Sequence, residues 1–273
     1  MGIRGSGKTT LAQYVYNDEK VQKYFELKMW ACISDVFDLK IIIEKIISST
    51  FGNAPVENFV IDQLQSQLRE KIVKKRILVL DDIWNEDLEN WRELKSLLMG
   101  GSKGSKIIKT SRIKLVVEIH TVSPYFLKGL CEEQSWVLFR QVAFRKWQEI
   151  NNPKLMTIGR EIVNMCHGAP LAIKSIGNVL YFKEKESEWS FMKNNIEANV
   201  TQGNEILPIL KMSYNHLPSH LKSRFTYCSL FPKDYEMDKE IVIQLWIAQG
   251  FVQSSNKNQQ LEDVSDEYFK DLL

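Results

Sequence analysis

The first ten residues carry the pattern most directly tied to chemistry. The pattern G-x-x-x-x-G-K-[ST] is matched at every fixed position by Gly2-Ile3-Arg4-Gly5-Ser6-Gly7-Lys8-Thr9. Glycines at these places let successive backbone N–H groups face a phosphate. The lysine supplies positive charge for the β- and γ-phosphates of a nucleotide, and the threonine hydroxyl can ligate Mg²⁺. The alternative is a glycine-rich turn that matches by chance, and the four fixed positions argue against it.

A helical segment follows this loop directly, with Leu11, Val15 and Tyr16 on one face. A phosphate held by the loop would therefore lie at a helix N-terminus, where backbone N–H groups are unpaired. One feature departs from the usual context, because such a loop follows a buried strand and only Met1 precedes Gly2. We predict that a nucleotide contacts these residues of the loop and helix: Gly2, Gly5, Ser6, Gly7, Lys8, Thr9 and Thr10.

An acidic pair follows a run typical of a buried strand. Residues 77–80, Ile-Leu-Val-Leu, show no polar alternation, as expected for a strand covered on both faces of a parallel sheet, and Asp81 and Asp82 come next. Ligand-binding groups lie at the C-terminal ends of such strands. Asp81 is therefore predicted to ligate Mg²⁺ together with Thr9, and Asp82 to orient or deprotonate a water. The alternative is an acidic pair that caps a turn.

Arg112 comes just after a third predicted strand, residues 105–110. From the same edge of the sheet it could contact a γ-phosphate. The alternative is an exposed arginine without function, and the spacing does not choose between them.

His216 and His220 have the spacing of a helical metal pair, but Pro218 lies between them, so we expect loop histidines. Most tryptophans are assigned to hydrophobic cores: Trp30, Trp84, Trp91, Trp136, Trp189 and Trp246.

The composition is that of an ordinary globular protein. Of 273 residues, 44% are hydrophobic and 26% charged, which allows two or three domains and excludes a disordered or fibrous chain. The formal charge of +2 is too small to indicate a nucleic-acid or anionic-membrane partner. The four cysteines include no C-x-x-C pair, so we expect neither zinc nor disulfides. Without a signal peptide or a membrane-length apolar run, the chain is predicted to be cytoplasmic.

Strands and helices alternate over the first part of the chain. Residues 25–33, 77–80 and 105–110 show the apolar pattern of strands, and the segments between them show the apolar spacing of helices. Together with the opening loop, this order predicts an α/β fold with a P-loop parallel sheet. Beyond about Tyr125 the spacing is helical only, and a further compact set of helical stripes begins near Ile206. We therefore predict a nucleotide-binding domain, a helical subdomain and a smaller third module over residues 1–125, 126–204 and 205–273.

Taken together, the motifs resemble the NB-ARC region of plant nucleotide-binding leucine-rich-repeat disease-resistance proteins. They occur in the family's order and cover almost the whole chain. Trp84, at the end of the Walker B motif, is typical of the coiled-coil branch of that family. Besides the loop, the similar segments are residues 25–38 (F-x-x-x-x-W-x-x-x-S-x-x-F-D), 78–84 (LVLDDIW, the Walker B motif), 104–112 (GSKIIKTSR, similar to G-S-R-I-I-x-T-T-R), 166–172 (CHGAPLA, similar to G-L-P-L-A), and 227–232 with 245–251 (winged helix).

The resemblance implies a P-loop sheet whose first strand is missing here, then a helical bundle and a partial winged-helix module. It implies that Arg112 senses phosphate and that Pro170 packs near the adenine. The expected ligands are ADP in the resting state and ATP with Mg²⁺ in the active state, so the chain would act as a defence switch through partner domains. Because the winged-helix module lacks a basic stripe, we expect it to act within the protein rather than on nucleic acid.

Departures from the family pattern matter as well. Arg4 occupies a position that is usually glycine, where it would either crowd the loop or add a phosphate contact. The strand and signalling domain before the loop, and the M-H-D motif and leucine-rich repeats after residue 273, are expected in the family and lie outside this sequence, so we expect a fragment or a truncated gene product. As an enzyme it would be at most a slow ATPase. The alternatives are an NTP hydrolase with turnover as its purpose and an interaction remnant that binds no nucleotide.

Overall fold

The chain folds into two compact units, Met1–Ile206 and Leu207–Leu273, in the computed structural model. The predicted boundary between residues 204 and 205 lies outside the described residues, as do residues 34–36 of the second motif. The structure describes residues 1–33, 37–50, 60–84, 87–114, 116, 124–145, 152–199, 206–232, 235–252 and 260–272.

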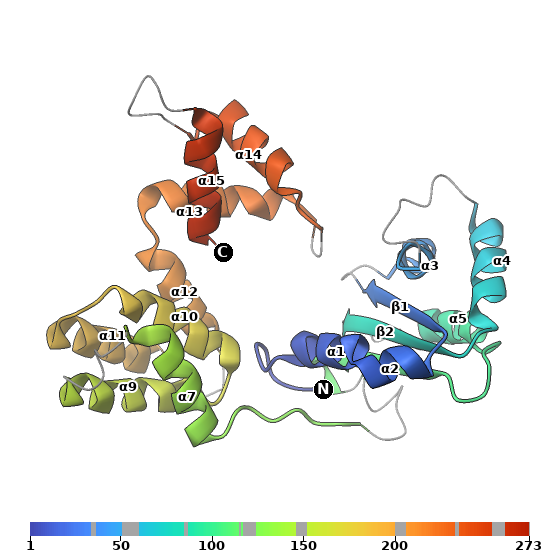
Figure 1. Ribbon diagram of the computed structural model, residues 1–273, viewed down its shortest axis with the longest axis horizontal. Helices are drawn as coiled ribbons and strands as arrows, with labels where there is room; N and C mark the ends of the chain where they lie inside the picture. The colour runs from blue at the N-terminus through green and yellow to red at the C-terminus, as the bar shows by residue number, and fades with distance from the viewer. Residues whose placement is uncertain are drawn as a thin grey trace. The chain divides into compact units, whose positions relative to one another are not determined.

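A parallel sheet forms the centre of the first unit (Figure 1). Its described strands are β1 (Leu27–Cys32), β2 (Arg76–Ile83) and β3 (Lys106–Ser111), in the order β1-β2-β3. β2 lies in the middle and is buried along nearly its whole length, as its unbroken apolar run predicts. It continues through the acidic pair to Ile83, so Asp81 and Asp82 are residues of the strand itself, and Asp81 pairs with Cys32 of β1.

Helices cover both faces of this sheet. Those around it are α1 (Lys8–Asn17), α2 (Glu19–Tyr24), α3 (Leu39–Ser48), α4 (Ile61–Ile72) and α5 (Leu88–Leu98). On one face Leu78 and Leu80 of β2 join a core with α3, α4 and α5, in which Ile43 is fully buried. The alternate residue Val79 is buried towards the other face, where α1 packs on β2. The side chain of Asp38 caps α3 by accepting the N–H of Ile41.

β3 has an open outer edge within the described sheet. Its first half is exposed, and Ile107 is 43% exposed. In front of the loop, Gly2 forms one isolated parallel bridge with Leu127, whose N–H donates to the carbonyl of Met1 over 2.7 Å. The terminal ammonium of Met1 donates to the carbonyl of Tyr125 over 2.8 Å. The start of the chain is therefore attached to the segment that leads into the helical part, and only at its first two residues.

A helical bundle completes the first unit. It contains α7 (Glu132–Ala143), α9 (Pro153–Met165), α10 (Pro170–Tyr181) and α11 (Glu186–Asn199). Its core is aromatic, with Trp136, Phe139 and Trp189 all buried. Gly159 of α9 faces this cluster, and a Cβ at that position would lie 2.9 Å from the ring of Phe139. The close approach of α9 therefore requires a glycine, because the neighbouring contact is a packed aromatic ring.

The second unit is helical in the part of it that is described. Its elements are α12 (Leu207–His216), α13 (Ser219–Tyr227), the 3₁₀ turn η1 (Cys228–Leu230), α14 (Lys239–Ala248) and α15 (Leu261–Leu272). Trp246 is fully buried at its core, and Arg224 is also buried, donating to the carbonyls of His220 and Phe251. The expectation of loop histidines was wrong, because His216 is the last residue of α12, bonded to the carbonyl of Met212, and His220 lies in the first turn of α13. Among the described residues no group of His, Cys, Asp or Glu is arranged to hold a metal ion.

Candidate functional site

The phosphate-binding loop has the backbone geometry that its glycines predict. Gly5 and Gly7 have φ angles of 70° and 88°, in the left-handed region that favours glycine. Gly7 is the N-cap of α1, so the unpaired N–H groups at the start of this helix lie next to the loop. A Cβ at Gly7 would meet nothing within 4 Å, which leaves open space above the helix end. The loop is thus built to present backbone donors to an anion.

Lys8 closes the loop on itself. Its ammonium donates to the carbonyls of Gly2, over 3.0 Å, and Ile3, over 2.9 Å. Burial lowers the pKa of Lys8, and the charge of Arg112 lowers it further, while Asp82 and Asp81 oppose the shift. These groups act on Lys8 because they lie within electrostatic reach of it. The structure therefore brings the predicted phosphate-binding lysine, the acidic pair and the predicted phosphate sensor into one place.

Thr110 on β3 fixes both members of the acidic pair. Its hydroxyl donates to the carboxylate of Asp81, which is only 3% exposed, and the same oxygen accepts the N–H of Asp82 over 2.8 Å. The pairing of β2 with β3 shifts register between Leu80 and Ile83, and Asp82 has a positive φ of 53°. A non-glycine residue rarely adopts this conformation, and such strain gathers at functional sites. The carboxylates are therefore held in defined directions at the C-terminal end of the central strand.

Asp82 also holds Arg112. Its Oδ2 accepts a hydrogen bond from the Arg112 guanidinium and another from the indole N–H of Trp84, each over 3.0 Å. The guanidinium lies over the Trp84 ring, 4.4 Å from its centroid. The assignment of Trp84 to a hydrophobic core was therefore wrong, because its polar edge and its ring face both serve the site. Its place directly after the Walker B run, where the sequence already resembles one branch of the family, was the available signal.

The start of α10 lies against the loop. Pro170 is the first residue of this helix, and the N–H of Leu171 donates to the carbonyl of Gly5 over 3.3 Å. A Cβ at Gly5 would lie 2.8 Å from the Leu171 Cβ, so this contact requires the glycine. Leu171 is nevertheless 43% exposed, which leaves apolar surface beside the loop. The structure thus places the predicted adenine-side residue, Pro170, next to the predicted phosphate site.

The predicted metal ligands occupy different positions. Thr9 and Thr10 lie in the first turn of α1 and are exposed, so their hydroxyls are accessible. Asp81 is buried at the end of β2 and bonded to Thr110. A joint role of Thr9 and Asp81 as ligands of Mg²⁺ stays a prediction. Arg4 is exposed in the loop.

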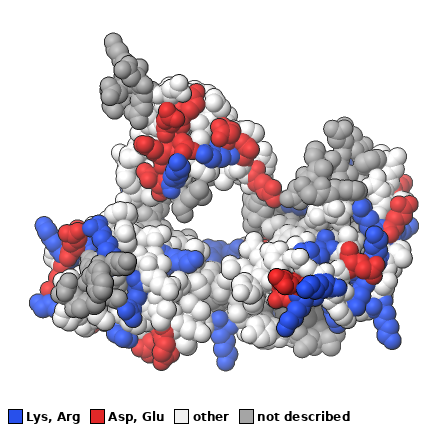
Figure 2. Space-filling model, in the orientation of Figure 1, with Lys and Arg blue, Asp and Glu red and all other residues white. Residues whose placement is uncertain are grey.

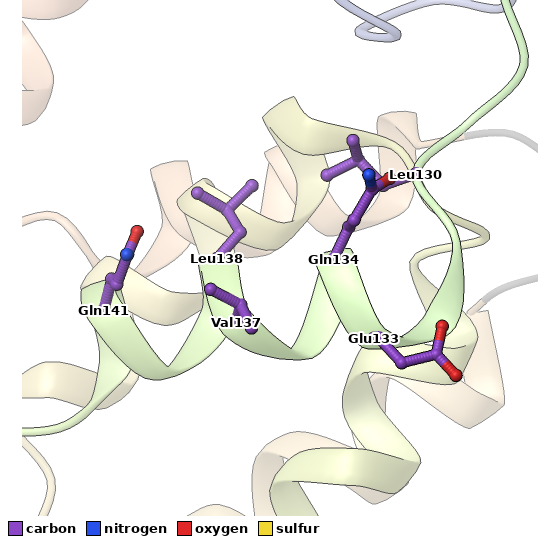
Figure 3. A pocket seen from close by; sticks show the side chains of 6 residues that line it. All are labelled: Leu130, Glu133, Gln134, Val137, Leu138 and Gln141. Atoms are coloured by element: carbon purple, nitrogen blue, oxygen red, sulfur yellow. The ribbon is translucent and has the colours of Figure 1, made fainter.

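A separate depression of about 350 Å³ lies along α7 (Figure 3). It contains none of the predicted site residues. Almost all of its wall comes from one helix, as Figure 3 shows, so it forms a shallow face rather than an enclosure. The residues that line it are Leu130, Glu133, Gln134, Val137, Leu138 and Gln141.

A glycine loop that opens a helix, beside a parallel sheet whose central strand ends in an acidic pair, defines a P-loop nucleotide-binding fold. The NB-ARC domain family matches residues 1–149, more than half of the chain, and the chain belongs to this family. The family described as Disease resistance protein Winged helix domain matches residues 230–273. Membership of the NB-ARC family implies nucleotide binding.

Curated relatives match along the whole chain. It is 44% identical over 275 residues to "Disease resistance protein RGA2" of Solanum bulbocastanum, and 37% identical over 277 residues to "Putative disease resistance RPP13-like protein 1" of Arabidopsis thaliana. It is also 33% identical over 291 residues to "Disease resistance protein RPM1" of Arabidopsis thaliana. All of this chain is covered in each match, but only 28%, 26% and 31% of those proteins, so it spans less than a third of their length.

Two further observations bear on partners. None of the helices in the described part of the chain has the length and apolar character needed to span a membrane. On the face of the second unit shown in Figure 2, acidic side chains gather in the region of α14 and α15. α15 itself contains five acidic residues and one lysine. This charge does not suit a helix that contacts a nucleic-acid backbone.

Proposed function

We propose that this chain is the ADP- and ATP-binding switch module of a plant disease-resistance protein. The observation that carries the proposal is the Asp82–Arg112 ion pair at the ends of β2 and β3, because α1, which follows the phosphate-binding loop, packs on both of these strands. A loop alone would indicate anion binding only. A loop with an acidic pair and a second cation beside it can distinguish nucleotides by their terminal phosphate.

The residues present fit a nucleotide diphosphate or triphosphate. The N–H groups at the start of α1 would bind phosphate oxygens, and Lys8 would exchange its bonds to Gly2 and Ile3 for bonds to phosphate. Ser6 supports this fit, since its buried hydroxyl has no hydrogen-bond partner among the described residues. At the start of α10, the half-buried Pro170 and the exposed Leu171 offer the apolar contact for a base.

Thr9 and Asp81 are the residues that would hold Mg²⁺. A hydroxyl and a carboxylate oxygen suit this hard cation, which binds oxygen ligands and keeps several waters. When bound, the ion would neutralise charge between the β- and γ-phosphates. Lys8 would neutralise the same phosphates from the loop side.

Arg112 and Asp82 would provide the switch. A γ-phosphate competes with the Asp82 carboxylate for the guanidinium, so the diphosphate and triphosphate states differ in which partner Arg112 binds. This difference is the differential affinity that a two-state switch requires. It also makes Asp82 a weak general base in the paired state, since its Oδ2 accepts two hydrogen bonds. A slow ATPase follows, rather than an enzyme made for turnover.

The second candidate is an NTP hydrolase with turnover as its purpose. The position of Asp82 next to Asp81, at the end of the central strand, favours it.

We further propose that the switch acts through other protein domains, namely signalling and leucine-rich-repeat regions, and in the cytoplasm. The four cysteines are all free thiols in the structure, as in a reducing compartment.

The test is to purify the chain, denature it, and identify the nucleotide released. Retained ADP with little phosphate release is the expected result. Steady multiple turnover of added ATP would favour the hydrolase. Release of no nucleotide, together with no binding of added ADP or ATP, would refute both and leave the interaction remnant. Lys8→Ala serves as the matched control, because it removes a ligand group from the loop.

A further inference from the structure

We infer that Trp84 is a positioning residue of this site, which holds Arg112 on Asp82 and thereby sets the preference between ADP and ATP. The inference rests on the proposed function and adds to it the residue that controls nucleotide discrimination. Trp84 lies directly after β2 and outside every phosphate-binding or metal-binding role predicted above.

Three side chains form a closed triangle. The indole N–H of Trp84 and the guanidinium of Arg112 both donate to Oδ2 of Asp82, and the guanidinium lies on the indole ring 4.4 Å from its centroid. Each side chain therefore contacts the other two. Tryptophan is suited to this place, because its N–H is a donor only and its ring is the best aromatic surface for a cation.

The triangle is sheltered enough for these contacts to matter. The side chains of Arg112 and Asp82 are only 27% and 17% exposed, so their ion pair is screened less than one on an open surface. The Trp84 ring covers one face of the guanidinium, and Trp84 itself is half-buried. The ion pair thus depends on the indole both for a fixed carboxylate and for a covered cation.

The side chains of Asp82 and Arg112 differ in conformational freedom. Asp82 is fixed at its backbone, by its bond to Thr110 and its positive φ, and at its carboxylate by the indole. Arg112 follows the end of β3 and carries a long side chain with several rotatable bonds. When a phosphate oxygen competes, Arg112 is therefore the group that moves, and Trp84 stabilises the position it leaves.

Loss of the indole should favour the triphosphate. With Trp84→Leu, Arg112 loses its ring contact and Asp82 loses a donor, so Arg112 is released to a γ-phosphate more readily. We expect the affinity for a non-hydrolysable ATP analogue, relative to ADP, to rise roughly threefold to tenfold, since ring and hydrogen-bond contacts of this kind change equilibria by such factors. Trp84→Phe keeps a ring without the N–H and should give a smaller rise.

The experiment measures the dissociation constants of ADP and the ATP analogue, both with Mg²⁺, by calorimetry on the full chain. The variants are Trp84→Leu, Trp84→Phe, Arg112→Gln and the double variant Trp84→Leu/Arg112→Gln. Trp30→Leu is the matched control, because Trp30 is also a half-buried tryptophan of this sheet and packs on Tyr16. It should leave the ratio unchanged. In the Arg112→Gln background, Trp84→Leu should have no further effect on the ratio.

The outcomes separate the two proposals. If the parent chain binds neither nucleotide, the proposed function fails and the inference falls with it. If the parent binds both and Trp84→Leu leaves the ratio unchanged, only the inference is overturned. An equal shift with and without Arg112 would also overturn it, because Trp84 would then act on the structure generally. A fluorescence difference between parent and Trp84→Phe that changes with the ATP analogue but not with ADP would support it independently.

Discussion

The hydroxyl of Thr110 on β3 donates a hydrogen bond to the buried carboxylate of Asp81 on β2. Because the same oxygen accepts the N–H of Asp82, one threonine satisfies two groups of the acidic pair. The two strands are parallel neighbours, so the contact joins residues 29 positions apart in sequence. The Thr110 side chain thus fixes the acidic pair of β2 against β3.

Thr110→Val should destabilise the first unit. Valine has the same shape but no hydroxyl, so the Asp81 carboxylate would stay buried without this donor. We expect a loss of about 1–3 kcal/mol in the free energy of unfolding, measured by urea denaturation. Thr110→Ser keeps the hydroxyl and is the control. Equal stability of the Val and Ser variants would mean that the hydroxyl is not what stabilises the pair.

Lys8→Ala should abolish nucleotide retention and leave the fold largely intact. The lost bonds run to the carbonyls of Gly2 and Ile3, within the loop itself, so the cores are untouched. The measurements are nucleotide release on denaturation and the circular dichroism spectrum. Lys20→Ala, at an exposed lysine of α2, is the control. A Lys8→Ala chain that kept its nucleotide would refute the role of the loop.

Asp81→Ala should weaken Mg²⁺-dependent binding of ATP more than binding of ADP. The reason is that a metal ion held by Asp81 would neutralise charge on the β- and γ-phosphates, and only ATP has both. Asp81→Asn is the matched variant, because it keeps an oxygen that can accept from Thr110. Titration of both nucleotides with and without Mg²⁺ gives the comparison. Equal losses for the two nucleotides would exclude Asp81 as the metal ligand.

The lowered pKa of Lys109 predicts that the stability of the fold depends on pH. Burial, and secondarily the charge of Lys95, lower its pKa from 10.5 to about 8, and its ammonium lies 4.7 Å from the centroid of the Trp91 ring. A lysine with a lowered folded-state pKa destabilises the fold fully below about pH 8, and the penalty fades as the pH rises towards 10.5. Lys109→Met should therefore stabilise the chain at pH 7 by on the order of 1–2 kcal/mol, discounted for partial exposure.

The gain in the free energy of unfolding from Lys109→Met should decrease between pH 8 and pH 10.5. Denaturant melts of parent and variant across this range measure it. Lys106→Met, at the exposed first residue of the same strand, is the control and should give a small change at every pH. A pH-independent gain from Lys109→Met would indicate that packing, rather than charge, causes it.

Local patterns predicted part of the site. The loop glycines, Lys8 and the buried run of β2 follow from short segments, because turn geometry and burial on both faces restrict residue type over a few positions. The Asp82–Arg112 pair could not be predicted in this way. It joins residues 30 apart, and it depends on the pairing of β2 with β3 and on the register shift after Leu80.

The contact of Leu171 with Gly5 likewise could not be predicted from short sequence segments. The family resemblance implied that Pro170 packs near the adenine, but the hydrogen bond from Leu171 to the loop depends on how the helical bundle packs against the sheet. Trp84 was assigned to a core because an aromatic residue after an apolar run usually packs there. Its indole N–H instead donates to the carboxylate of Asp82, a residue with a positive φ of 53°.

The open edge of β3 leads to a prediction on the loop itself. Ile107 is exposed at this edge, and Met1 and Gly2 are joined to the segment after the sheet through Tyr125 and Leu127. A parallel strand placed before Gly2 would cover the edge and hold the loop from both ends. Each Val or Ile so buried would contribute about 1.5–3 kcal/mol before the entropy of ordering the added residues is subtracted.

We therefore expect that about eight apolar, β-branched residues added before Gly2 raise the stability of the chain by a few kcal/mol net and tighten ADP binding. Binding should improve because preorganised N–H groups at Gly5 to Lys8 lose less freedom when a phosphate binds. Thermal unfolding and ADP calorimetry are compared with those of an extension of equal length made of Ser, Gly and Asp. If the parent, the polar extension and the apolar extension melt alike and bind ADP equally, the edge of β3 needs no further strand and the loop is already held by its contacts with Leu127 and Leu171.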